Sequence, residues 1–147
     1  MEESTVKLLG SIIAGAGLAF ALVALPASAH EAPTSLEGLP LLADVAPDAV
    51  QISPHVPNMG AHWARTDDLP TGPIYCEIEG HVVCVEYMFT MEDFEAGTDW
   101  TSLTPGIETP PISHIDVEFM PEGIEPNPVP LYQLHIYFAG TQVLDQH

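Results

Sequence analysis

Residues 112–120 read ISHIDVEFM, and apolar and polar side chains alternate along this stretch. Successive side chains of a β-strand point to opposite faces, so the alternation predicts a half-buried strand. The apolar face, which we expect to lie against the core, carries Ile115, Val117 and Phe119. The opposite face carries His114, Asp116 and Glu118.

Residues 131–139, LYQLHIYFA, show the same alternation, and a loop with four prolines at 121–130 separates the two stretches. We expect the two strands to pair, with Met120 near Leu131 across the loop. Asp116 then faces His135. A slip of one residue would turn one strand over, so any register that preserves the core places His114, Asp116, Glu118 and His135 on one face.

A second hairpin is predicted from the β-branched and aromatic residues at 74–78 and 82–91. A three-residue loop, 79–81, would place Cys76 opposite Cys84. These are the two cysteines of the chain, and their even number favours a disulfide in an oxidising compartment over free thiols. Glu86 lies within the second, otherwise apolar strand, where an unpaired charge would be costly.

Between the hairpins, Thr90 is placed to cap a short helix that Gly97 ends. Proline-rich loops follow at 99–111 and 121–130. The expected fold class is therefore α+β: a mainly antiparallel β-sheet with short helices and long proline-rich loops, after an N-terminal signal helix.

The expected domain organisation has four parts. Residues 1–29 resemble a signal peptide, with an apolar run before Ala27-Ser28-Ala29, or else an uncleaved anchor. Residues 30–52 are expected to form an extended arm, residues 53–140 a single β-rich domain and residues 141–147 a loose tail. We accordingly expect an exported protein, periplasmic or extracellular, that is membrane-bound only if its N-terminal segment is retained.

The formal net charge is −19, with 2 basic and 21 acidic residues. Nucleic acids and anionic membranes would be repelled by such a surface. Cations are the natural counter-ions of such a surface, but charge alone does not identify a ligand.

Histidine and carboxylate side chains on one sheet face are typical ligands of zinc, copper or iron. We expect a lid formed by residues 53–63, SPHVPNMGAHW, to deliver two further histidines, while Met59 and Gly60 shape its turn. Asp116 would support a ligand rather than bind the ion. The predicted metal ligands are His55, His62, Glu86, His114, Glu118 and His135.

The alternative is a non-catalytic structural or oligomer-forming envelope protein whose histidines only connect loops to the sheet. The sequence has no G-x-S-x-G elbow, phosphate-binding glycine loop, H-E-x-x-H helix or C-x-x-C pair. An enzymatic activity would have to rest on the His/Glu site. Whether the chain is an enzyme stays open.

Several motifs resemble a little-characterised family of exported domains, the TTHB two-ten-like group, over residues 53–139. They are HVPNMGAHW at 55–63, GPIY at 72–75, VEYM at 85–88, SHIDVEF at 113–119 and HIY at 135–137. The resemblance implies an α+β domain able to form homo-oligomers, and it implies no particular activity. Ile124 and Leu131 stand where that family carries further histidines.

Overall fold

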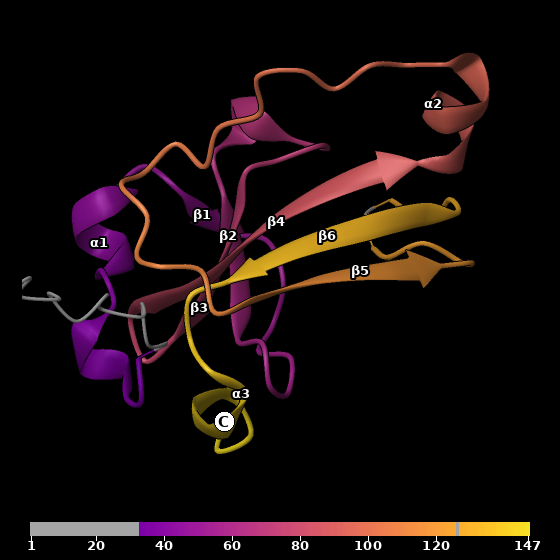
Figure 1. Ribbon diagram of the computed structural model, residues 1–147. Helices are drawn as coiled ribbons and strands as arrows, with labels where there is room; N and C mark the ends of the chain where they lie inside the picture. Colours follow the sequence, from indigo (N-terminus) through magenta and orange to yellow (C-terminus); the bar gives the residue numbers. More distant parts are fainter. Residues whose placement is uncertain (1–32, 126) are drawn as a thin grey trace, which may run out of the picture.

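The computed structural model describes residues 33–125 and 127–147. Over these residues the chain forms one six-stranded sheet with short helices (Figure 1). The elements in chain order are η1 (Leu36–Gly38), α1 (Leu42–Val45), β1 (Val50–Gln51), β2 (Ala61–Ala64), η2 (Thr66–Asp68), β3 (Ile74–Ile78), β4 (His81–Thr90), α2 (Met91–Ala96), β5 (His114–Met120), β6 (Leu131–Tyr137) and α3 (Thr141–Leu144). The expected α+β class is confirmed, while the expected signal helix lies outside the described residues.

The strand order is β1-β2-β3-β4-β6-β5, and every pair is antiparallel. β4 is the longest strand and lies inside the sheet, where its residues 82–88 are all buried. A run rich in valine suits this position, because a central strand covered on both faces needs no alternation. Any polar side chain on β4 is therefore held deep in the domain.

The register predicted for the last two strands is confirmed. Asp116 pairs with His135 and Met120 pairs with Leu131. β6 in turn pairs with β4, and this places Glu86 directly beside His135. The sequence pattern did not reveal this second pairing.

The prediction that Ile115, Val117 and Phe119 face the core is wrong. Their exposed fractions are 53%, 61% and 48%. β5 is one of the two edge strands. The long loop after α2 lies over β4 and β6, where its Leu103 and Pro105 share a cavity with Val85 and Tyr87. The face that carries the histidines is the more buried face of β6.

The hairpin of β3 and β4 pairs Cys76 with Cys84, and the two residues form a disulfide with a Cα–Cα distance of 5.0 Å. The three-residue loop that the sequence suggested is wrong, because Ile78 pairs with His81. A register shift next to Cys76 absorbs one residue, and the turn has positive φ at both of its central residues. This is the two-residue turn that best matches the twist of a hairpin.

The N-terminal arm is folded from residue 36 onward, rather than extended. Leu36, Leu39 and Leu42 are all buried in the core; Leu36 lies in η1, Leu39 directly after it and Leu42 at the start of α1. The backbone of this segment also bonds to the start of β4, with Val82 N donating to Pro40 O over 2.9 Å. Similarly, the tail contains α3, which buries Val143 and Leu144 rather than remaining loose.

The predicted helix after β4 is confirmed as α2, where the Thr90 side chain accepts a hydrogen bond from the Asp93 amide and Gly97 ends the helix in the left-handed conformation. Among the described residues, no helix has the length and apolar character needed to cross a membrane.

Candidate metal centre

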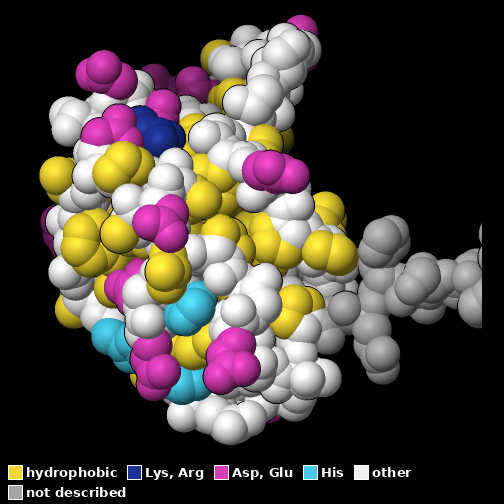
Figure 2. Space-filling view, turned by 90° about the vertical axis from the view of Figure 1, so that its left-hand side faces the viewer, with side chains coloured by type: hydrophobic (Ala, Val, Ile, Leu, Met, Phe, Trp, Pro, Cys, Tyr) yellow, Lys and Arg dark blue, Asp and Glu magenta, His cyan; other side chains and the backbone are white. Residues whose placement is uncertain are grey.

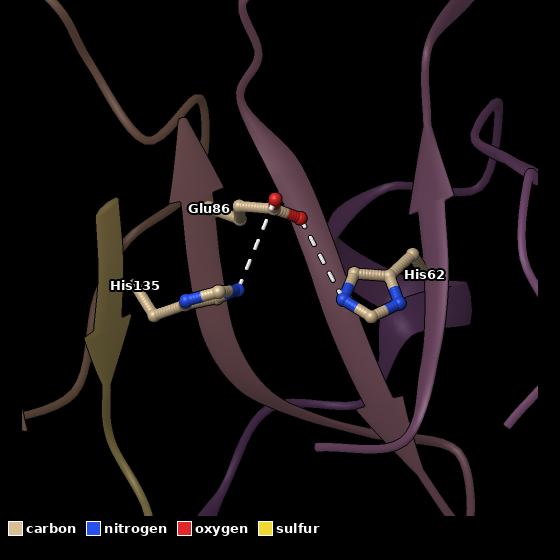
Figure 3. A group of neighbouring side chains, drawn as sticks. All are labelled: His62, Glu86 and His135. Carbon is tan, nitrogen blue, oxygen red and sulfur yellow. Dashed lines mark ion pairs between the residues drawn. The ribbon is translucent and has the colours of Figure 1, made fainter. Parts of the chain in front are cut away.

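Three buried side chains from three strands meet on one face of the sheet. They are His62 of β2, Glu86 of β4 and His135 of β6, and one potential ligand atom from each lies within 4.8 Å of the others. Figure 3 shows Glu86 between the two imidazole rings. The exposed fractions are 7%, 1% and 0%, so bulk water does not compete strongly for these groups.

The strand registers explain why the three side chains meet. Glu86 and His135 are direct partners across β4 and β6. His62 approaches Glu86 from the other side of β4. It lies on β2, two strands from β4, and its cross-strand partner is Cys76, which in turn pairs with Cys84. Adjacent strands lie about 4.8 Å apart, so a histidine and a glutamate can span the intervening strand.

The separations within this group suit two ligands of one ion better than a hydrogen bond. His62 Nε2 lies 3.6 Å from Glu86 Oε2, and His135 Nε2 lies 3.8 Å from Glu86 Oε1. Hydrogen bonds between such atoms are normally about 2.7–3.2 Å long. Two donors bound to one tetrahedral zinc ion lie about 3.4 Å apart. A small contraction would therefore allow the group to bind an ion.

Ser53 orients the ring of His62. Its hydroxyl donates to Pro54 O over 2.9 Å and accepts from the His62 amide over 3.0 Å. The same hydroxyl oxygen lies 2.8 Å from His62 Nδ1. This contact orients the ring so that Nε2 faces Glu86, and with the proton on Nδ1 the Nε2 atom could bind an ion.

His135 is buried without a hydrogen-bond partner for either ring nitrogen among the described residues. An unpaired buried polar group typically costs about 1–3 kcal/mol. Nδ1 lies 3.6 Å from Glu118 Oε2, on the other side of the ring from Glu86. An ion on Nε2 and a slightly shorter Nδ1–H to Glu118 contact would satisfy both nitrogens. Carboxylates support metal-bound histidines in this way.

Glu86 is held by Gln133, whose Nε2 donates to Oε1 over 2.6 Å. Burial raises the pKa of Glu86 to about 7, and Gln133 opposes this shift. Burial also lowers the pKa of His135 to about 4, and it lowers the pKa of His62. Both histidines are thus neutral near pH 7, which is the form that binds metals.

Met59 differs from the sequence-based expectation that it only shapes the turn. Its sulfur atom lies 3.1 Å from His62 Nε2, on the side of the ring that faces the group. The tight turn at 56–60, closed by Gly60 N donating to Val56 O over 2.8 Å, folds the methionine back over the histidine.

The structure does not bring every predicted ligand into the group. His55 is exposed, and its Nε2 donates to the backbone oxygen of His147 over 2.9 Å. His114 stacks on Tyr137 at 4.5 Å, and its Nε2 lies 3.9 Å from Asp116. Glu118 thus has the supporting position that the sequence suggested for Asp116. The predicted lid delivers one histidine rather than two.

Sequence reasoning missed Ser53 and Gln133, and it assigned Met59 to the shape of the turn rather than to the group. Gln133 could have been found, because it lies two residues from His135 on the same face of the strand. Ser53 gave no comparable signal, since its role depends on how the chain crosses from β1 to β2.

Comparisons with known proteins give a fold and no activity. No protein-family model matches this chain, and no curated protein matches it. The structure is similar to the crystal structure of a hypothetical protein, TTHB210, from Thermus thermophilus, with a TM-score of 0.52 and 17% identity over 65% of this chain and 94% of that one. The likeness shows a shared fold with an uncharacterised protein, whereas the motif-level grouping suggested by the sequence stays a prediction.

Proposed function

We propose that this protein is an exported domain that binds a divalent transition-metal ion through His62, Glu86 and His135. The observation that carries the proposal is the unpartnered, fully buried imidazole of His135 beside the Glu86 carboxylate. His62 Nε2 lies 3.6 Å from the same carboxylate. Electron-pair donors that converge in a buried site repel one another unless a proton or a metal cation lies between them.

Zinc and copper are the ions that this donor set suits best. Two histidines and a glutamate form a known ligand set of catalytic zinc sites, which keep a fourth position open for water or substrate. The nearby Met59 sulfur is a soft donor that would favour copper. With an open position the ion could activate water, and with Met59 bound it would be a closed site.

Export is supported by the disulfide between Cys76 and Cys84, because such bonds persist in oxidising compartments. The signal-like segment at 1–29, which lies outside the described residues, would direct the chain there.

A cobalt titration of the untagged, chelator-treated domain tests the proposal. Cobalt(II) serves as a spectroscopic probe of a zinc-type site, and we expect one ion per chain. Substitution of residues that only support a ligand typically costs about 10–100-fold in affinity, so His135→Ala should cost at least about 100-fold. His55→Ala is the matched control, because the structure holds His55 away from the group, and its affinity should equal that of the wild type.

Equal affinities for the wild type and His135→Ala would overturn the proposal. Loss of metal binding in His55→Ala alone would instead place the metal site in the loop at 53–63.

An assembly role without catalysis is the second candidate, and the exposed apolar face of β5 favours it. Ile115, Val117 and Phe119 lie on an edge strand, whose free backbone groups can pair with another chain. Sedimentation of the metal-free protein tests this function. A stable oligomer that Val117→Glu dissociates, and that His135→Ala leaves intact, would support it.

A further inference from the structure

A cavity of about 660 Å³ lies beside the candidate metal centre. The proposed function assigns no ligand to this cavity. Its volume is within the range of small-molecule sites, about 300–1,000 Å³. Most of its walls are aliphatic or thioether side chains, which include Ile52, Ile74, Met88, Met120 and Ile124. Apolar walls offer few partners for ordered water, so this space suits a hydrocarbon better than a solvent cluster.

The cavity and the metal centre share a wall. His62, Glu86 and Met59 line the cavity as well as the centre, whereas His135 is not among the lining residues. An ion held by the three ligands would therefore have His135 on its far side and the cavity on its near side. Its open position would face the apolar space.

The charges around the cavity exclude an anionic occupant in the metal-free protein. Glu118 and Glu125 also line it, and both are exposed at its rim. None of the lining residues is lysine or arginine. Arg65 is the one lysine or arginine among the described residues, and its Nε donates to Asp48 Oδ1 over 2.8 Å. Figure 2 shows the same imbalance on one face, where acidic side chains lie scattered among hydrophobic ones.

We propose that this cavity binds a small, uncharged, mainly apolar organic molecule whose single lone-pair-donating head group points toward His62 and Glu86. In the metal-loaded protein the head group occupies the open position of the ion. Binding of the head group to the ion rests on the proposed function, whereas binding of the hydrocarbon body of the molecule does not.

Binding of an apolar molecule in the cavity is tested on the metal-free protein with N-phenyl-1-naphthylamine, an uncharged fluorescent probe. We expect saturable binding with one site per chain. Met120→Trp, which fills the cavity, should weaken it at least about tenfold, because an over-filled apolar site has no room for the probe. Val117→Trp is the matched control, since it adds the same ring to the exposed face of the same strand and should leave binding unchanged.

Ile124→Trp, in the loop after β5, gives a second cavity-filling variant in case Met120→Trp fails to fold. Absence of probe binding to the wild type overturns the proposal, and so does equal binding by Val117→Trp and the folded cavity-filling variant.

Binding of the head group at the open position of the ion is tested by titrating imidazole and 1-butylimidazole into the cobalt-loaded protein. Each methylene group that enters the cavity should tighten binding by about fourfold, so the butyl compound should bind far more tightly than imidazole. The cavity-filling variant should lose this difference while it still binds imidazole. If both compounds bind equally to the wild type, the cavity does not face the open position of the ion, and this part of the proposal fails.

The two proposals fail in different ways. Absence of a cobalt spectrum refutes metal binding but leaves the probe experiment intact. Metal binding without probe binding refutes only the cavity.

Discussion

The orientation of two imidazole rings determines what the candidate centre can do. The Ser53 hydroxyl lies 2.8 Å from His62 Nδ1 and orients that ring. His135 has no comparable hydrogen bond, and Glu118 is the acceptor within reach of its Nδ1. The two rings thus depend on different supports, one already formed and one that an ion would complete.

Glu118→Gln is expected to lower metal affinity about 10–100-fold, since an amide accepts the Nδ1 proton of His135 less strongly than a carboxylate. Glu125→Gln is the matched control, because it removes the same charge from the cavity rim without a contact to His135. Competition against a calibrated zinc chelator measures both. Equal losses in the two variants would show that Glu118 acts only through its charge.

Metal affinity is expected to rise with pH and to level off above about pH 7. Burial raises the pKa of Glu86 to about 7, so below that value a proton occupies the carboxyl group that the ion needs. Each unit of pH below 7 should therefore weaken apparent binding about tenfold. The neutral histidines add a dependence only in more acid solution, because burial lowers the pKa of both.

Binding isotherms between pH 5 and pH 8 measure this dependence, and Glu86→Gln should bind weakly with a flatter profile. An affinity that does not change over this range would exclude Glu86 as a ligand.

Among the elements, the turn before β2 positions two of the side chains at the centre. Gly60 has φ +90°, and a Cβ atom there would collide with the Glu77 carbonyl group of β3. Gly60→Ala should therefore destabilise the domain by more than about 2 kcal/mol. Gly38→Ala, at a site with open space around it, should change stability little. Urea unfolding measures both, and equal stabilities would mean that the turn can move away from β3.

The pairing of β5 with β6 could be predicted in register from two features. Strict alternation excludes a slip of one residue, and a position of Met120 near Leu131 across the loop selects one of the remaining registers. The exposure of Val117 could not be predicted in the same way. Alternation separates two faces of a strand, but it does not say which face the rest of the chain covers. Here the loop after α2 covers β4 and β6 and leaves the outer face of β5 open.

The candidate centre was predictable only to the extent that it lies on the sheet. His135 and Glu118 follow from the alternation of β5 and β6, and Glu86 was marked by its place in an apolar strand. His55 and His62 had equal claims in the sequence. The difference between them arises from the path of the loop, which places His62 in β2 and leaves His55 bonded to the backbone of His147.

At the scale of the whole molecule, a single twisted sheet carries the site on one face, while the long loop after α2 crosses the other (Figure 1). The sequence carries a net charge of −19, which weakens the compact state through repulsion and attracts cations. A bound ion would therefore both connect three strands and reduce this repulsion.

Added zinc is expected to raise the melting temperature of the intact domain. At a free concentration 100 times the dissociation constant, binding to the folded state alone adds about 2.7 kcal/mol, or on the order of 10 °C for a domain of this size. Calorimetry at pH 7.5 measures the shift, and excess chelator should reverse it. Magnesium at the same ionic strength is the control for simple charge screening. An equal rise with magnesium would assign the effect to net charge.

Anomalous diffraction from crystals grown with zinc tests the central claim most directly. The account predicts one strong peak within about 2.0–2.2 Å of His62 Nε2, His135 Nε2 and a carboxylate oxygen of Glu86. A peak at His55 and His147, or none at the three strands while zinc is bound in solution, would contradict it.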